Sequence, residues 1–214
     1  MPINLEYKAP FFYERSYHVF NRSVFGQQLF YHTENYAFFL DKMQTYLSDL
    51  VIFRSWSLIP NHFHLFITTR PFEEVQTQQK FELELMPLLT SRFKNFFICY
   101  SNALKKERGI KTNVFAQKYR HKAVLTDEQT TNLYHYIHHN PLHHGLTREW
   151  ETYPWSSYRD IVTGDGRITE VNLALEWFGG RESFIQQHRL NATRFFEEFE
   201  VKQRRRAGIR VPNP

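Results

Sequence analysis

The chain has 214 residues, enough for one domain of ordinary size or for one domain with an extension. Aromatic residues make up 17% of it and can fill a sizeable core. The single cysteine, Cys99, excludes an internal disulfide bond and fits a reducing compartment. The sequence shows no signal-peptide pattern and no apolar run long enough to span a bilayer, so we expect a cytoplasmic protein without a membrane partner.

The net charge of +5 is modest, but the positive charge is concentrated in two segments. Residues 92–122 contain nine lysines and arginines against the single acidic residue Glu107, and a second basic cluster closes the chain in VKQRRRAGIR. Such runs are often solvated surface, but two of them favour a polyanionic partner such as nucleic acid. The cations that we expect to meet phosphates are Arg92, Lys105, Lys106, Arg108, Lys111, Lys118, Arg120, Lys122, Arg204, Arg205 and Arg206.

The first half of the chain alternates between strand and helix patterns. Residues 15–23 are aromatic and β-branched with rough alternation, which predicts a strand. Apolar residues at helical spacing predict a helix over 32–50, and two strands follow at 51–59 and from the turn at Pro60 onward. The polar segment 70–84 is weakly patterned, and we expect a loop there.

The second half continues with the clearest helix, at 88–109, and a short strand at 119–126. Thr126 or Asp127 can cap a further helix, which should end before Pro141 because the residue before a proline avoids the helical region.

This order is that of a ferredoxin-like α+β fold, an antiparallel sheet backed by two helices, with one extra helix after the last strand. We expect a domain over 1–160 and a helical extension with a basic tail over 161–214, built from short helices.

The stretch LIPNHFHLFITT, residues 58–69, places two histidines at alternate positions of a predicted strand. Successive side chains of a strand point to opposite faces, so His62 and His64 share a side while Phe63, Leu65 and Ile67 take the buried one. On an exposed face, two such imidazoles can chelate one cation. A pair of this kind is weak support for a metal site by itself.

A second stretch, YHYIHHNP at 134–141, strengthens that hypothesis. Tyr136 and Asn140 are four residues apart, so on one helix their side chains would project together. Asn140 could then add an oxygen ligand, and Tyr136 could act as a nucleophile beside the cation. Alternatively, Tyr136 packs on the sheet and Asn140 merely ends the helix. His135 and His139 could instead complete a zinc site, whereas we expect His138 to be exposed or to face phosphate.

These motifs resemble those of the single-tyrosine HUH transposases, in particular their REP-associated branch. NHFHLFI is similar to the family's histidine–hydrophobic–histidine signature, and YIHHNP followed by HHGL and YPWSSY resembles its tyrosine helix. SYHVFNRSVFGQQLF and NVFAQKYRHKAVLTDEQ are similar to the branch's first strand and to the strand before the tyrosine helix. The resemblance covers roughly residues 13–160. It implies metal ligation by His62, His64 and Asn140, and catalysis by Tyr136 rather than the neighbouring Tyr134.

The resemblance also implies a reaction, a cofactor and a partner. The protein would cleave and rejoin single-stranded DNA, at hairpin or palindromic sequences, through a 5′-phosphotyrosine intermediate. It would depend on Mg²⁺ or Mn²⁺ and act as a monomer or homodimer. Two alternatives remain at this point: a zinc-dependent phosphodiester hydrolase that uses water, and a nucleic-acid-binding relative without catalysis.

Overall fold

The computed structural model describes residues 9–24, 27–78, 84–116 and 118–206, the last thirteen of them by their backbone only. The described residues group into two compact units, which divide between Val171 and Asn172. Among the described helices, none has the length and apolar character needed to cross a membrane.

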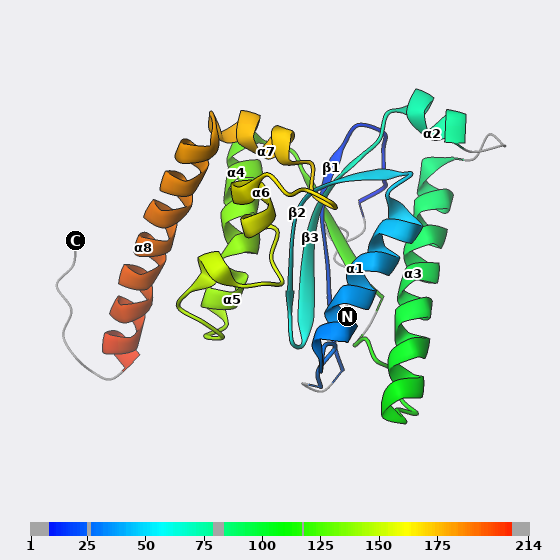
Figure 1. Cartoon of the computed structure of the whole chain (residues 1–214), viewed down its shortest axis with the longest axis horizontal. Coiled ribbons are helices and arrows are strands. Elements are labelled where there is room, and N and C mark those ends of the chain that lie inside the picture. The colour runs from blue at the N-terminus through cyan, green and yellow to red at the C-terminus, as the bar shows by residue number, and fades with distance from the viewer. Residues whose placement is uncertain (1–8, 25–26, 79–83, 117, 207–214) are drawn as a thin grey trace. The chain divides into compact units, whose positions relative to one another are not determined.

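The first unit is built on a sheet of four strands: β1 (Ser16–Arg22), β2 (Val51–Ile59), β3 (His62–Thr69) and β4 (Arg120–Val124). Their spatial order is β2-β3-β1-β4, and every neighbouring pair is antiparallel. This is the ferredoxin-like order, so the α+β prediction is confirmed. It places the two central strands, β1 and β3, side by side (Figure 1).

Helices α1 (Thr33–Leu47) and α3 (Leu85–Arg108) pack on one face of the sheet and enclose the main core (Figure 1). The apolar residues predicted to line the longer helix at a 3.6-residue period are all buried, among them Phe93 and Phe96. The helix ends at Gly109, whose φ of 65° is the left-handed conformation that closes many helices. Replacing one such buried phenylalanine by alanine typically costs about 3–5 kcal/mol of folding free energy.

A further helix, α4 (Asp127–His138), covers the opposite face of the sheet (Figure 1). Thr126 caps it, because its hydroxyl accepts a hydrogen bond of 3.1 Å from the backbone N–H of Gln129. The face that carries the histidines is therefore not open, as the sequence suggested, but partly covered by a helix. His64 is only 6% exposed.

The helix predicted to fail before Pro141 does end there, at His138. A short helix, α5 (Asn140–His143), follows after His139, with the proline in its first turn, where its missing N–H is not needed. The remaining short helices of this unit are η2 (Trp150–Thr152) and α6 (Tyr158–Thr163).

The segment predicted as a loop contains a helix, α2 (Phe72–Gln78). The prediction was wrong because the weak apolar pattern hid one anchor, Val75, which is buried at 2% exposure. An ion pair of 2.9 Å between Arg70 and Glu74 adds support across one helical turn.

The second unit comprises most of α7 (Val171–Phe178) and all of α8 (Arg181–Arg206). The last element is one helix of 26 residues rather than a short helix. Phe184 and His188 lie one turn apart on it, with rings 4.1 Å apart, and both pack against Phe178. The division of the chain at residue 160 stays a prediction, as do the roles of Arg204, Arg205 and Arg206, whose side chains lie outside the described part.

Candidate functional site

Strand pairing brings the two histidines of β3 against the polar face of β1. Phe20 lies opposite His64, and Arg22 lies opposite His62. The imidazole centroids of His62 and His64 are 5.2 Å apart, and their planes are nearly perpendicular. The two rings thus share one side of the sheet, as their alternation along the strand predicts.

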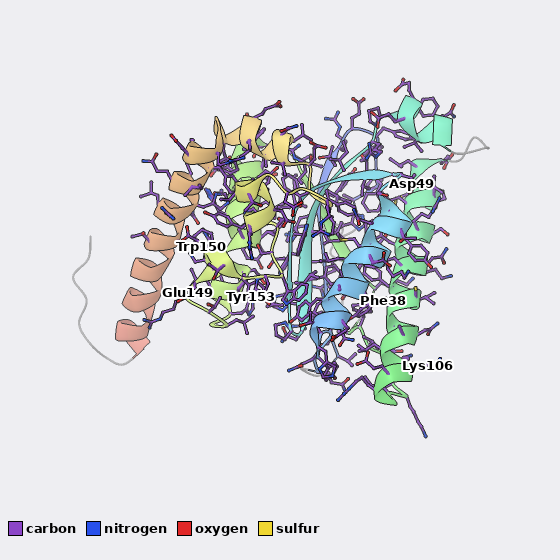
Figure 2. All side chains as sticks on the ribbon, viewed as in Figure 1. Phe38, Asp49, Lys106, Glu149, Trp150 and Tyr153 are labelled. Carbon is purple, nitrogen blue, oxygen red and sulfur yellow. The ribbon has the colours of Figure 1, made fainter. Side chains whose placement is uncertain are left out.

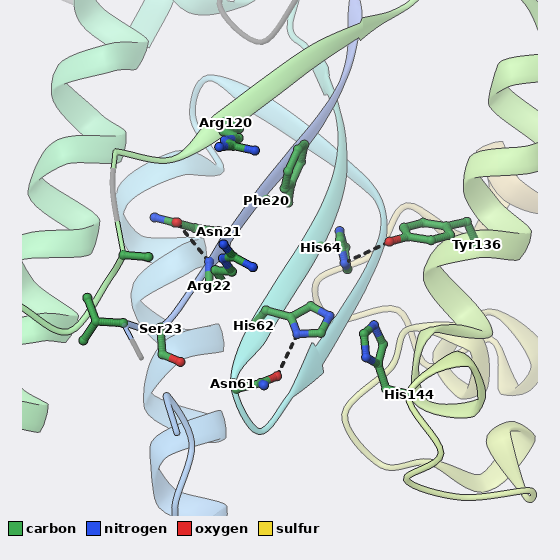
Figure 3. A pocket seen from close by; sticks show the side chains of 12 residues that line it. Phe20, Asn21, Arg22, Ser23, Asn61, His62, His64, Arg120, Tyr136 and His144 are labelled. Atoms are coloured by element: carbon green, nitrogen blue, oxygen red, sulfur yellow. Dashed lines mark hydrogen bonds between the residues drawn. The ribbon is translucent and has the colours of Figure 1, made fainter. Parts of the chain in front are cut away.

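Each of these rings has a partner on the nitrogen nearer its backbone. Nδ1 of His62 lies 2.7 Å from the side-chain oxygen of Asn61, which accepts its hydrogen (Figure 3). Nδ1 of His64 lies 2.9 Å from Nε2 of His18 on β1. With a hydrogen on Nδ1, each ring keeps the Nε2 lone pair that a metal ligand requires. His18 was not predicted as a site residue, although it alternates with Phe20 and Arg22 on the same face of β1.

Tyr136 approaches this pair from α4. Its hydroxyl lies 3.5 Å from Nε2 of His64, and its ring centroid is 5.1 Å from that of the histidine (Figure 3). Its side chain is 39% exposed, and burial of the remainder raises the pKa of the phenol above its ordinary value. The hydroxyl therefore carries its proton at neutral pH.

The neighbouring tyrosine, Tyr134, is turned away from this site. It is fully buried, and its hydroxyl accepts a hydrogen bond of 3.0 Å from Nε of Arg54 on β2. Its ring packs edge-on against Phe66. Of the two tyrosines, only Tyr136 presents its oxygen to the histidines.

Asn140 does not lie on the helix of Tyr136. The break at His139 places it at the start of α5, so the expectation that both side chains project from one helix was wrong. Its side chain is fully buried, and neither its oxygen nor its nitrogen makes a hydrogen bond with a described residue. Its side chain is nevertheless near enough to His62 for a weak hydrogen-bonding interaction, which raises the pKa of that ring. An unsatisfied buried amide costs free energy, which a bound cation would recover.

The histidine pair is held neutral by its surroundings. Burial, reinforced by His144 and Arg22, lowers the pKa of His62 to about 4 despite the opposing effect of Asn140. Burial also lowers the pKa of His64, and His18 adds to that effect. Protons therefore do not compete with a metal ion for these nitrogens at neutral pH.

The zinc alternative with helix histidines is not supported by the geometry. Within the described part of the chain, no three His, Cys, Asp or Glu side chains are grouped so that they could hold a metal ion. The rings of His135 and His139 are stacked with their centroids 6.1 Å apart, and the ring of His139 packs edge-on against Trp150. His138, expected to be exposed, is fully buried and bonds through Nε2 to the hydroxyl of Ser157 at 3.0 Å.

A cavity of about 780 Å³ opens in front of the histidines (Figure 3). Two arginines line it: Arg120, which the basic segment predicted, and Arg22, which it did not. Arg22 could have been found from the alternation of β1. The remaining lining residues are Phe20, Asn21, Ser23, Val24, Asn61, His62, His64, Ala116, Tyr136 and His144.

The predicted basic segment does not form one surface, because the sheet separates α3 from the histidine face. Arg92 is paired with Asp49 at 2.9 Å on the α3 side, where Lys106 also lies (Figure 2). Arg108 stacks over the ring of Tyr31. Lys105 and Lys118 line a separate cavity beside α3, Lys111 is exposed, and Lys122 lines a cavity next to Tyr136.

Comparison with known proteins gives a likeness in fold. The chain matches no protein-family model and no curated protein sequence. It resembles the structure of a REP-associated tyrosine transposase bound to a REP hairpin, with a TM-score of 0.57 and 19% identity over 74% of this chain and 86% of that one.

Two complexes of a bacterial tRNA(His) guanylyltransferase-like protein are more distant. The ATP complex has a TM-score of 0.39 and 9% identity over 63% of this chain and 61% of that one. The GTP complex has a TM-score of 0.41 and 10% identity over 68% of this chain and 72% of that one. The likeness to the transposase structure establishes a shared fold.

The buried His138 predicts how stability depends on pH. Burial lowers its pKa well below 6.5, with smaller effects from His139 and His135, so it takes up a proton on unfolding once the pH falls below about 6.5. The free energy of unfolding should therefore decrease as the pH falls. In the His138→Gln variant the slope near pH 5.5 should be smaller by about 1.4 kcal/mol per pH unit, the value for one proton.

Urea unfolding of both proteins between pH 8 and pH 5 measures the two slopes. At pH 8 neither state binds this proton, so a difference there reports the lost contacts of the ring, including those with Ser157 and Tyr158. Equal slopes for the variant and the wild type would show that His138 is protonated in the folded protein.

Proposed function

We propose that this protein is a metal-dependent, transposase-like enzyme that cleaves and rejoins single-stranded DNA at hairpin or palindromic sequences. The observation that carries the proposal is the placement of the Tyr136 hydroxyl 3.5 Å from Nε2 of His64. The phenol and the paired imidazoles meet at a cavity that also contains two arginines. A nucleophile, a candidate cation site and phosphate-binding charges are the parts that phosphoryl transfer needs.

In the proposed reaction, the oxygen of Tyr136 attacks the phosphorus of a DNA phosphodiester. A phosphotyrosine bond to the 5′ side forms while the bond to the 3′ oxygen breaks. The phenol loses its proton, and the released 3′ oxygen gains one. One phosphodiester is exchanged for another, so a later 3′-hydroxyl can reverse the step without an external energy source.

The proposed cation ligands are Nε2 of His62, Nε2 of His64 and the side-chain oxygen of Asn140. Two neutral imidazoles and an amide oxygen fit a divalent ion, and the unsatisfied amide of Asn140 supports that fit. We favour Mg²⁺ or Mn²⁺, because the phosphate itself would add oxygen ligands. When bound, such an ion polarises the phosphate and offsets its developing charge.

The protein's own residues would contribute orientation and charge. Hydrogen bonds from His62 to Asn61 and between His64 and His18 hold both rings in position. Arg22 and Arg120 lie in the same cavity and would hold the negatively charged phosphate. The raised pKa of Tyr136 means that its proton must leave as the new bond forms.

Hairpin DNA is proposed as the substrate on the likeness in fold. The structurally similar protein is a transposase bound to a REP hairpin. Cations on both sides of the sheet would contact such a duplex and its flanking single strand, so binding should weaken steeply with salt. The proposed enzyme acts as a monomer or a homodimer.

The nucleophile can be tested by removing one oxygen. Incubated with single-stranded hairpin DNA and Mn²⁺, the wild type should form a protein–DNA adduct that survives SDS, and Tyr136→Phe should form none while DNA binding changes less than threefold. The matched control is Tyr134→Phe, which loses the hydrogen bond to Arg54 but keeps the ring packed against Phe66, and should keep the adduct. Normal cleavage by Tyr136→Phe would mean that water is the attacking group.

The cation ligands can be tested without any reaction. Because His62 supplies one of three proposed ligands, His62→Ala should weaken Mn²⁺ binding at least tenfold in a titration followed by electron paramagnetic resonance. The same change at His32, an exposed histidine at the start of α1, should leave Mn²⁺ binding unchanged. Equal affinities of the wild type and His62→Ala would place the cation elsewhere.

A further inference from the structure

A second cavity, of about 580 Å³, lies between α4 and β4. Among the described residues, Tyr136 is the only one that lines both this cavity and the one in front of the histidines. The residue that we propose as the nucleophile therefore borders both cavities. Each of them has a volume within the range of small-ligand sites.

The two cavities differ in their chemistry. The first presents two arginines and the histidine pair, which suit a phosphate. The second is lined by Leu125, Leu133 and the aliphatic residues of β4, with Lys122 and Asn132 beside them. Gln129 and His18 also line it. An apolar lining with two amides and one cation suits a nucleobase and its neighbouring phosphate.

The lining of the second cavity is held in place by local structure. Asn132 and Tyr136 are one turn apart on α4, so their side chains lie on one face of the helix. Gln129 accepts a hydrogen bond of 2.8 Å from the backbone N–H of Leu125, which fixes the chain just before the helix. The side chain of Leu125 remains 77% exposed at this position. Single exposed leucines are common, but this one borders a cavity shared with the nucleophile.

The direction of attack assigns the nucleotides to the cavities. In phosphoryl transfer, the attacking oxygen, the phosphorus and the leaving oxygen lie roughly in line. The Tyr136 hydroxyl points toward His64, so the leaving 3′ oxygen and its nucleotide must lie beyond the phosphorus, in the first cavity. The other nucleotide keeps the phosphate on its 5′ oxygen, which does not lie on this line. Its chain must therefore extend to one side of the line, close to the phenol, where the second cavity lies.

We infer that the second cavity binds the base of the nucleotide on the 3′ side of the cleaved bond, the one that becomes attached to Tyr136 through its 5′ phosphate. This inference rests on the proposed function and adds a strand direction to it. Leu125 and Leu133 contact the face of the base, Asn132 bonds to its edge, and Lys122 meets the following phosphate. The cavity thereby holds the attached end in place until a 3′-hydroxyl arrives to rejoin it.

The experiment combines a change in the protein with a change in the DNA. A hairpin oligonucleotide is first used to map the bond at which the wild type forms its adduct. An abasic residue is then placed on the 3′ or the 5′ side of that bond, and initial rates of adduct formation are compared for the wild type and Leu125→Ser. Leu146→Ser is the control, since Leu146 is also exposed but lines neither cavity.

On intact DNA, Leu125→Ser should reduce the rate about tenfold, in line with the loss of base stacking on an apolar wall. The abasic residue on the 3′ side should reduce the wild-type rate by a similar factor. Combining both changes should give little further loss, because each removes the same contact. The rate reductions caused by the 5′ abasic residue and by Leu125→Ser should multiply, because they remove different contacts. Leu146→Ser should give wild-type rates on all three DNAs.

Independent effects of Leu125→Ser and the 3′ abasic residue would overturn the assignment of the cavity while leaving the phosphotyrosine reaction intact. Coupling to the 5′ abasic residue would reverse the proposed strand direction. Absence of any adduct between the wild type and intact DNA would overturn the proposed function and this inference together. The three failures are therefore distinguishable.

Discussion

The packing of α4 on the second face of the sheet is the constraint on which the site depends. Tyr134 anchors the helix through Phe66 and the hydrogen bond from Arg54. His138 anchors it one turn later through Ser157, whose hydroxyl also accepts a hydrogen bond from the backbone N–H of Trp56 on β2. The residue between them, Tyr136, faces His64.

The same packing explains the electrostatics of the site. Covering the histidine face excludes water from the rings, and that burial is the largest cause of the low pKa of His62, His64 and His18. Neutral imidazoles can then serve as ligands, while the two arginines that line the cavity supply the positive charge. A single structural feature, a helix laid over a polar sheet face, thus yields both the proposed nucleophile and the proposed cation ligands.

The strand order, the alternation of His62 and His64 and the cap at Thr126 could be predicted because they follow from periods of 2 and 3.6 residues and from capping chemistry. The break at His139 could not be located to the residue, so Asn140 was assigned to the wrong helix. The prediction of one basic surface over residues 92–122 was wrong for a different reason. This segment runs from α3 through β4 and so passes from one side of the sheet to the other, which a linear count of charges does not reveal. His18 and Arg22 were missed because pairing between β1 and β3 was not used to extend the site.

The most direct test is to locate the nucleotide on the protein. Digestion of the wild-type adduct with trypsin and nuclease should leave the nucleotide on the peptide Ala123–Arg148, which contains both Tyr134 and Tyr136. Fragmentation in a mass spectrometer should place the added mass on Tyr136. A nucleotide on Tyr134, or on a peptide elsewhere in the chain, would contradict the account, because the exposed phenol beside His64 would then not be the nucleophile.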